Sequence, residues 1–366
     1  MTLTSQLHEI ARDKGAARTG VCDVEPFVAE RAELRERVAN GMYGGLTFTF
    51  SNPERATDIR GSFPWAHRLF VAGWAYLPGA GSPGPPEPGT ARVARFATRD
   101  HYVPLRLVLA DVAAALEGAG YRAVVLVDDN RLVDRGAAVR SGVGWWGKNT
   151  MVLAPGVGPW MLLGSVVTDA PLDVDAPMVR DCGSCDACLP ACPTGALVAP
   201  GVLDARRCLA AMLQQAGKIP LEYRVAVGDR LYGCDDCLDA CPPGGRLAAS
   251  SVRRVGRHDI VSLLAMDDST LLNEFEHFYV PKRRAAILRR NALVVLGNVG
   301  TPDDIPLLAG FLSHPLELLR CHAAWAIGRI GGPHAVDVLA AADRIEPAAD
   351  VQAELRDALA DARTTE

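Results

Sequence analysis

The sequence predicts a multidomain α+β protein, and three observations along its 366 residues support this prediction. A first block mixes helix and strand patterns. A middle segment contains eight of the ten cysteines and little apolar periodicity, and the remainder shows helical patterns without strand signals. We therefore expect three domains, at residues 1–176, 177–248 and 249–366.

The first block alternates amphipathic and β-type segments. Residues 3–15 have apolar residues at helical spacing, and RTGVCDV after them predicts a short strand. LRLVLADVAAALEGAG (105–120) predicts a helix that ends at glycine. Three further apolar runs bounded by turn residues predict strands: HRLFVAGWAYL (67–77), YRAVVLVDD (121–129) and WMLLGSVVTD (160–169). This block is expected to fold as an α+β domain with a sizeable core.

Composition and charge narrow the classes of function. Apolar residues make up 49% and charged residues 22%, which is typical of a soluble globular protein. The net charge of −5 means that a nucleic-acid partner would have to meet a local basic patch. We see neither a signal peptide nor an apolar run of membrane-spanning length, so we expect a cytoplasmic protein without membrane contact. In that reducing compartment, closely spaced cysteines indicate metal or redox chemistry.

Four cysteines at 182–192 follow the pattern C-x2-C-x2-C-x3-C-P, which bacterial ferredoxins use for [4Fe–4S] clusters. The short spacing brings three thiolates onto one cubane, and the fourth cysteine, before proline, ligates a different cluster. A second run at 234–241 also ends before proline but has only three cysteines. Cys208, between the two runs, is the expected replacement.

Exchange of the fourth ligands predicts two complete clusters. Cluster 1 is expected on Cys182, Cys185, Cys188 and Cys241, and cluster 2 on Cys192, Cys208, Cys234 and Cys237. One or two structural zinc sites with four cysteines each are the alternative. The remaining cysteines, Cys22 and Cys321, lie among apolar residues and are expected to be small core side chains.

A glycine-rich stretch, GVGWWGKNT (142–150), nearly matches a phosphate-binding loop. Gly142, Gly147 and Lys148 fit, but Asn149 occupies the position of the magnesium-binding hydroxyl, so ATP chemistry is not expected. Two interpretations stay open: a backbone turn that approaches a bulky ligand, or a turn whose two tryptophans pack on the core.

The C-terminal segment contains an internal repeat. RNALVVLGNVG (290–300) and RCHAAWAIGRIG (320–331) align at an offset of 31 residues, which also places Leu308 over Leu339. A helical, apolar repeat of this period predicts HEAT-like units. Two units are few for a free solenoid, so we expect them to dock on the cluster domain.

The clusters alone leave three designs open: an electron carrier resembling ferredoxin, a reductase with its own catalytic cofactor, and a partner-binding protein with structural clusters. A pure carrier has little use for a large α+β domain and helical repeats. The domain organisation therefore favours a reductase.

Several stretches together resemble the epoxyqueuosine reductase family, cobalamin-dependent enzymes that complete queuosine in the tRNA anticodon. They are CGSCDACLPACPTGAL (182–197), GDRLYGCDDCLDACP (228–242), DRGAAVRSGVGWWGKNT (134–150) and the HEAT-like unit. The resemblance implies a nitroreductase-like, cobalamin-processing-like α+β domain, a ferredoxin-like domain with two [4Fe–4S] clusters, and HEAT-like repeats that help to bind tRNA. The implied reaction converts the epoxide of epoxyqueuosine at the wobble position to queuosine, with two electrons, two protons and loss of water. A monomer supplied by an external ferredoxin or flavodoxin is expected.

The resemblance also assigns roles to residues. Asp128 matches the family's proton donor, which also contacts the cofactor; Asp129 beside it is the alternative. Arg135 is implied to contact tRNA, although an ion pair with Asp134 would explain it equally well. The positions matching cobalamin contacts are Arg55, Lys148, Val152 and Leu163.

Basic residues before and within the repeat helices, namely Arg283, Arg284 and Arg290, are candidates for tRNA phosphate contacts; a solvated helix face is the alternative. The stretches 95–103 and 128–131 depart from the family's usual pattern. They leave open a related cobalamin reductase that acts on a different substrate.

Overall fold

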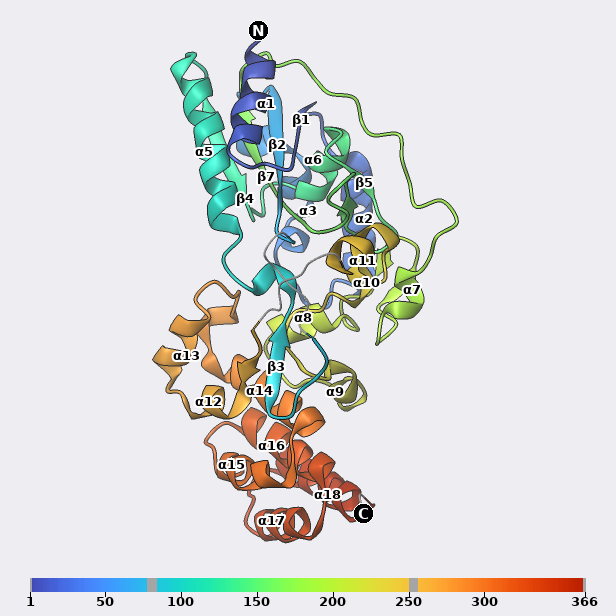
Figure 1. Cartoon of the computed structure of the whole chain (residues 1–366), viewed down its shortest axis with the longest axis vertical. Coiled ribbons are helices and arrows are strands. Elements are labelled where there is room, and N and C mark those ends of the chain that lie inside the picture. Colours follow the sequence, from blue (N-terminus) through green and yellow to red (C-terminus); the bar gives the residue numbers. More distant parts are fainter. Residues whose placement is uncertain (1, 78–83, 250–255, 365–366) are drawn as a thin grey trace. The chain divides into compact units, whose positions relative to one another are not determined.

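The computed structural model describes residues 2–77, 84–249 and 256–364 (Figure 1). The chain forms two compact units. Unit 1 consists of 1–82, 99–208 and 235–253, and unit 2 of 83–98, 209–234 and 254–366. This grouping differs from the expected division at 176 and 248, because most of the cysteine-rich segment belongs with the first block whereas 209–234 belongs with the helical repeats.

Unit 1 is built on a four-stranded antiparallel sheet with the strand order β1-β2-β7-β4. These strands are β1 (Arg18–Asp23), β2 (Arg68–Ala75), β7 (Met161–Thr168) and β4 (Ala123–Val127). Each coincides with one of the predicted runs. Strand β4 is an edge strand of the sheet. The loop that follows β4 therefore begins at the edge of the sheet.

Helices cover both faces of this sheet (Figure 1). On one face, α1 (Leu3–Asp13) and α5 (Tyr102–Gly118) contribute buried leucines and valines that pack against Phe70 and Val166. On the other face, α6 (Asp134–Arg140) packs Ala137 and Ala138 against the sheet. Cys22 is fully buried in this second layer, and burial raises the pKa of its thiol to about 12, as expected of a core side chain.

The other elements of unit 1 are short. They are α2 (Val28–Ala39), η1 (Thr49–Ser51), α3 (Pro53–Thr57), α4 (Ile59–Ser62), β5 (Trp145–Trp146), β6 (Val152–Leu153), α7 (Cys188–Ala191), β8 (Leu197–Ala199), β9 (Val202–Leu203), α10 (Asp236–Asp239) and α11 (Pro242–Ala249). The cysteine-rich loops thus contain single-turn helices and two-residue or three-residue strands, and the longer helix α11 follows the last cysteine.

Unit 2 begins with elements that sequence patterns did not reveal. A three-stranded sheet has the order β10-β3-β11. Strand β11 lies after residue 249, where the sequence patterns predicted no strand. The elements that precede the repeats are β3 (Thr90–Val93), η2 (Arg95–Ala97), α8 (Leu209–Gln214), α9 (Leu221–Val227), β10 (Arg230–Tyr232), β11 (His258–Asp259), α12 (Ile260–Ala265), α13 (Asp268–Glu274) and η3 (Pro281–Arg283).

The predicted repeat is confirmed as two helix pairs followed by a closing helix. They are α14 (Ala285–Val299), η4 (Pro302–Asp304) and α15 (Ile305–Phe311), then α16 (Glu317–Ile330) and α17 (Pro333–Asp343), with α18 (Ala349–Thr364) last. A Cβ on Gly297 would lie 2.8 Å from the Cα of Ala326 in α16, and one on Gly328 would lie 2.8 Å from the Cα of Ala358 in α18. The two aligned glycines therefore allow equivalent close helix crossings.

Arg290 has a structural position, which corrects its expected contact with tRNA phosphate. The side chain is 1% exposed, and its guanidinium donates to the carbonyl oxygens of Met212, Gln215 and Gly217. Asn291 next to it donates to the carbonyls of Leu213 and Leu231. These bonds attach the segment 209–234 to α14 within unit 2.

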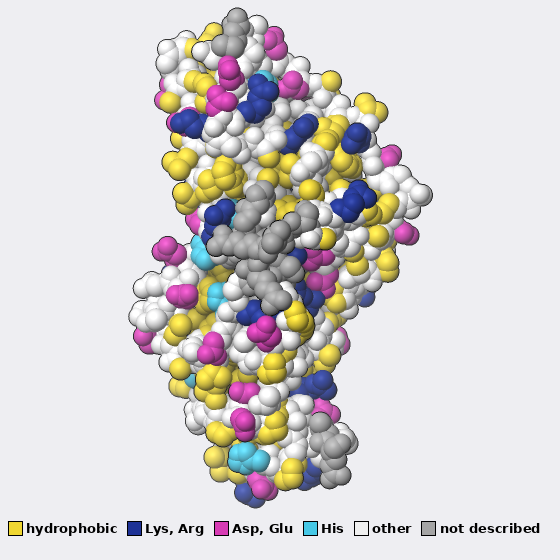
Figure 2. Space-filling model, viewed as in Figure 1, with side chains coloured by type: hydrophobic (Ala, Val, Ile, Leu, Met, Phe, Trp, Pro, Cys, Tyr) yellow, Lys and Arg dark blue, Asp and Glu magenta, His cyan; other side chains and the backbone are white. Residues whose placement is uncertain are grey.

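Surface charge is mixed, in agreement with the small net charge. Figure 2 shows basic and acidic side chains interspersed on the visible face. Within the described ranges, no helix combines the length and apolar character needed to cross a bilayer.

Candidate active site and cluster ligands

The glycine-rich turn at 142–150 contacts the cysteine loops. Lys148 Nζ donates to the carbonyl of Gly183 at 2.8 Å, and Asn149 Nδ2 donates to the carbonyl of Cys237 at 3.4 Å. A Cβ on Gly144 would lie 2.3 Å from the carbonyl oxygen of Leu153 in β6. The close backbone approach is therefore made by this chain's own strand. Lys148 supports a cysteine loop, and its contact with a cofactor stays a prediction.

The four cysteines predicted for cluster 1 lie within electrostatic reach of one another. Burial raises the pKa of Cys188, and the thiolate charges of Cys241, Cys182 and Cys185 raise it further. Burial and the charges of Cys182 and Cys185 also raise the pKa of Cys241. At short range, the charge of one thiolate disfavours ionisation of the next thiol. A positively charged iron centre offsets this repulsion, so the group suits a site that binds iron through thiolates.

Cys192, predicted for cluster 2, has a different environment. Burial opposes ionisation, but backbone N–H groups at Leu197, Thr194 and Ala196 hold the pKa of Cys192 below its ordinary value. The N–H of Ala196 lies 3.1 Å from its Sγ. Hydrogen bonds of this kind to a ligating sulfur are a usual means of tuning iron–sulfur clusters.

The cysteine geometry bears on the zinc alternative. In the part of the chain that the structure describes, no three His, Cys, Asp or Glu side chains converge closely enough to hold a single metal ion. A mononuclear zinc site needs all its sulfurs about 2.3 Å from one atom, whereas a cubane distributes its four thiolates over four irons. The assignment of these cysteines to two cubanes therefore stays a prediction at this point.

Asp128 lies directly after β4, in a loop at the edge of the sheet. Its backbone has a φ of 53°, a left-handed conformation that is uncommon for residues other than glycine and is found most often for Asn and Asp. Solvent reaches the side chain, yet the surrounding protein desolvates it enough to raise the pKa of its carboxyl group. Arg106 opposes this rise, and the charge of Asp129 adds to it.

Asp129, the alternative proton donor, is engaged elsewhere. Arg131 donates to both of its carboxylate oxygens, with Nε 2.9 Å from Oδ1 and Nη2 2.5 Å from Oδ2. These bonds hold the pKa of Asp129 below its usual range. Asp129 therefore remains an anion, whereas Asp128 is the carboxyl group whose pKa is shifted toward that of a proton donor.

Residues of α5 and α6 complete the group around Asp128. Burial raises the pKa of Tyr102, and the charges of Asp128 and Asp134 raise it further. Arg106 lies one helical turn from Tyr102, with its guanidinium 5.5 Å from the ring centroid. Sequence analysis missed these two residues, although polar side chains at i and i+4 on an otherwise apolar helix were a usable signal.

Asp134 and Arg135 begin α6. Burial, with a contribution from Asp128, raises the pKa of Asp134 well above its usual range, and its Oδ1 is buried without a hydrogen-bond partner among the described residues. Desolvation lowers the pKa of Arg135, while the charges of Asp134, Cys237 and Cys208 oppose this. Arg135, which is exposed, is thus within electrostatic reach of Asp134 and of two cysteines predicted for cluster 2.

Asp134→Asn is expected to make the protein more stable toward high pH. A carboxyl group whose pKa is raised in the folded state contributes stability that is lost as the pH rises through that pKa. Because Asn stays neutral, the unfolding midpoint of the variant should gain on that of the wild type as the pH rises from about 5 toward the raised pKa of Asp134. Asp173→Asn, at an exposed position in unit 1, is the matched control; equal pH trends for both variants would contradict the prediction.

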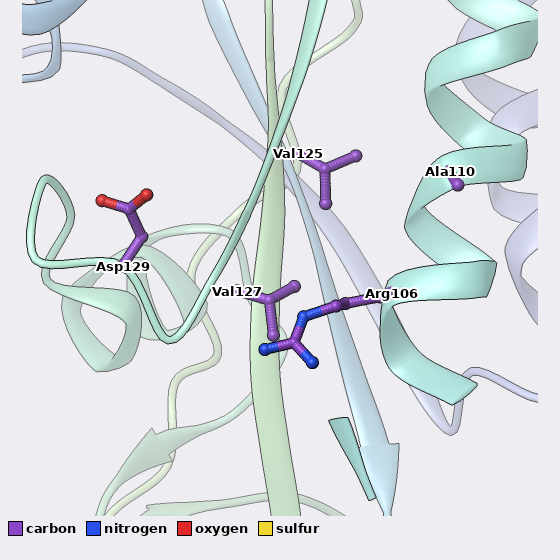
Figure 3. A pocket seen from close by; sticks show the side chains of 5 residues that line it. All are labelled: Arg106, Ala110, Val125, Val127 and Asp129. Atoms are coloured by element: carbon purple, nitrogen blue, oxygen red, sulfur yellow. The ribbon is translucent and has the colours of Figure 1, made fainter. Parts of the chain in front are cut away.

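An open depression of about 380 Å³ lies beside Asp129, between α5 and β4 (Figure 3). It is lined by Arg106, Ala110, Val125, Val127 and Asp129. Figure 3 shows the Arg106 guanidinium next to Val127, with Asp129 on the loop that follows the strand. A depression of this size suits a small group or one part of a larger ligand.

The other residues predicted to contact cobalamin lie in different surroundings. Arg55 is exposed on α3 and within electrostatic reach of Asp129. Val152 is 4% exposed and belongs to the core layer that also contains Ala137 and Ala138 of α6. Leu163 packs against the same core layer. Arg55 is therefore placed near Asp129, whereas Val152 is a core side chain and Leu163 is half-buried against that core.

Arg283 and Arg284 lie in unit 2 before α14. Both are exposed, and Lys282 and Arg283 have φ angles of 53° and 50°. Arg283 donates to the carbonyls of Leu272 and Glu276, which fixes its side chain along the turn. These two arginines remain accessible to a ligand, in contrast to Arg290.

Comparisons with known proteins agree with these features. The family described as "4Fe-4S double cluster binding domain" matches residues 181–244, and HEAT repeats match 282–360. Epoxyqueuosine reductase of Vibrio cholerae is 33% identical over 89% of this chain and 91% of its own length. That of Pseudomonas aeruginosa is 34% identical over 90% and 95%. The chain belongs to the epoxyqueuosine reductase family.

Solved structures support this assignment. A crystal structure of epoxyqueuosine reductase with an epoxyqueuosine-modified tRNA-Tyr stem loop matches 99% of both chains, with a TM-score of 0.89 and 28% identity. A Bacillus subtilis epoxyqueuosine reductase with its aspartate catalytic loop swung out of the active site matches 98% of both chains, with a TM-score of 0.88 and 28% identity. The predicted family, fold class and oxidoreductase class are thereby confirmed, as is a 4Fe-4S domain.

Proposed function

We propose that this enzyme reduces the epoxide of epoxyqueuosine at the tRNA wobble position to queuosine, using cobalamin supplied with electrons by two [4Fe–4S] clusters. The observation that carries this proposal is Asp128, a solvent-accessible carboxyl group whose pKa the surrounding protein raises, at a residue with left-handed backbone. The family relationship supplies the substrate, since a solved relative was crystallised with a modified tRNA stem loop. A relative with an aspartate on its catalytic loop supports the role of Asp128.

Two clusters are supported by the cysteine environments. Cys182, Cys185, Cys188 and Cys241 affect one another's ionisation, as ligands of one cubane would. Cys192, Cys208, Cys234 and Cys237 are the proposed ligands of the second cluster. An external ferredoxin or flavodoxin is the proposed electron donor.

One feature of the group around Asp128 supports cobalamin binding there. The buried Oδ1 of Asp134 has no partner among the described residues, and such an atom calls for a donor from a bound molecule. Arg55, Asp128, Asp134 and Arg135 are the residues proposed to hold the cofactor. Cobalamin, when bound by these residues, would supply the strongly reducing chemistry that opening of the strained epoxide needs.

The chain's own part in the reaction is to control protons. Expelling a bare alkoxide at neutral pH is slow, so the oxygen of the opening epoxide needs a proton from an acid in contact with it. Asp128 is proposed to donate that proton, and its raised pKa keeps more of it protonated. With two electrons and two protons, both carbon–oxygen bonds break, a carbon–carbon double bond forms and the oxygen leaves as water.

Binding of tRNA is proposed to involve Arg283 and Arg284. Both are exposed on a turn with left-handed backbone at Lys282 and Arg283, a conformation that holds neighbouring side chains in defined directions. Cations of this kind position a nucleic acid through its phosphates and do not read its bases. The affinity should then fall as salt is added.

The decisive experiment is anaerobic turnover of epoxyqueuosine-containing tRNA by the cluster-loaded enzyme with cobalamin and a reductant, followed by mass analysis of the nucleosides. Formation of queuosine supports the proposal. No queuosine from an enzyme that contains both clusters and cobalamin would overturn it, and would favour a related reductase with a different substrate.

A further inference from the structure

Trp145 is a buried tryptophan whose indole N–H has no hydrogen-bond partner among the described residues. Its side chain is 9% exposed. Buried indole N–H groups usually find a partner, because leaving one unpaired costs free energy. Trp160 illustrates the rule in the same unit, where its Nε1 donates to the carbonyl of Gly244 at 2.9 Å. The indole N–H of Trp145 therefore needs an acceptor other than the described protein atoms.

The immediate surroundings of Trp145 indicate which acceptor this is. Trp145, Leu153 and Cys241 form one small buried cluster, with Met178 packed against it. The guanidinium of Arg180 lies 5.7 Å from the centroid of the indole ring. Among these residues, the sulfur of Cys241 is the side-chain acceptor, and the cluster that Cys241 is proposed to bind adds further sulfur acceptors.

The backbone around Trp145 holds the ring in place. Trp145 pairs with Leu153 in the β5–β6 hairpin, and Gly144 before it lies against the Leu153 carbonyl. A few residues further on, Lys148 donates to the carbonyl of Gly183, between Cys182 and Cys185. The same turn therefore fixes the indole and one of the loops that carry cluster 1 ligands.

We propose that the Trp145 indole N–H donates a hydrogen bond to a sulfur of cluster 1, on or next to Cys241, and so raises the reduction potential of that cluster. This inference rests on the proposed ligation of cluster 1. A donor to a cluster sulfur stabilises the more negative, reduced form, and hydrogen bonds to the sulfurs are among the factors that set cluster potentials. Trp145 is thus a positioning and tuning residue, not one that touches the substrate.

Trp145→Phe tests the proposal, because phenylalanine keeps an aromatic ring but has no N–H donor. We expect the one-electron reduction constant of one cluster to fall about tenfold, which corresponds to a potential lower by about 59 mV. The other cluster should keep its potential. The measurement is an anaerobic redox titration of the purified protein followed by electron paramagnetic resonance.

Trp146→Phe is the matched control, since Trp146 is the next residue and is 42% exposed. Its cluster potentials should equal those of the wild type. An unchanged potential in the Trp145→Phe protein with full iron content would overturn the inference, while leaving the proposed function intact. A wild-type protein without iron–sulfur signals would instead overturn the proposed function.

A second measurement decides the case if Trp145→Phe fails to hold its clusters. The sample is the Trp146→Phe variant with 15N in its indole groups, because this variant keeps Trp145 and lacks the neighbouring indole. It should show a 15N coupling to a reduced cluster in pulsed electron paramagnetic resonance. A spectrum without such a coupling, from protein with both clusters reduced, would contradict the hydrogen bond.

Discussion

Asp128→Asn is expected to lower the turnover rate by about 10²-fold to 10⁴-fold, the usual contribution of a general acid. Asn has nearly the shape of Asp and also tolerates the left-handed backbone observed at this position, where φ is 53°. The variant should therefore keep its fold, its clusters and its affinity for tRNA. Single-turnover formation of queuosine, measured with iron content and tRNA binding, checks this result.

The pH dependence of the wild-type rate provides a further readout of Asp128. A proton donor works in its protonated form, so the rate should fall as the pH rises through its raised pKa. Because Arg106 opposes the rise of this pKa, Arg106→Gln should shift the decline to higher pH. Asp128→Asn should lack this decline.

Asp129→Asn is the matched control, with the same chemical change one residue further along. Asp129 is paired with Arg131 and has a lowered pKa, so it does not serve as an acid. Its substitution should change the rate much less and leave a decline toward high pH. Equal losses in the two variants would contradict the assignment of Asp128 as proton donor.

Arg290→Met is expected to reduce the free energy of unfolding of unit 2 by about 3–5 kcal/mol. Methionine fills much of the same space but leaves the carbonyls of Met212, Gln215 and Gly217 buried without their donor. Burial lowers the pKa of Arg290 to about 10, so the guanidinium is still charged at neutral pH and its hydrogen bonds are charge-assisted. Chemical unfolding followed by circular dichroism checks the loss.

Arg284→Met separates this structural effect from tRNA binding. Arg284 is exposed, and its substitution should change the stability by no more than about 0.5 kcal/mol while weakening tRNA binding. Similar stability losses in both variants would contradict the structural role of Arg290.

Local patterns in the sequence determined most of this protein's architecture. Proline-terminated cysteine runs predicted the iron–sulfur segment, and a 31-residue offset predicted the helical repeat, since spacing of this kind is a property of neighbouring residues. The four strands of the main sheet were recognisable for the same reason, because apolar runs between turn residues are local signals. Asp128 was found through family motifs, and the structure added the environment that raises its pKa.

Only the tertiary structure decided the roles that depend on distant contacts. Arg290 and Arg284 are both basic residues near the start of one helix, yet the fold buries the first among carbonyls more than 70 positions away and leaves the second exposed. Lys148 and Trp145 resembled parts of a ligand-binding turn, but their neighbours are Gly183 and Cys241. The sequence encodes a side chain's charge and its hydrogen-bond donors. Packing between segments far apart in the chain determines which groups these donors and charges contact.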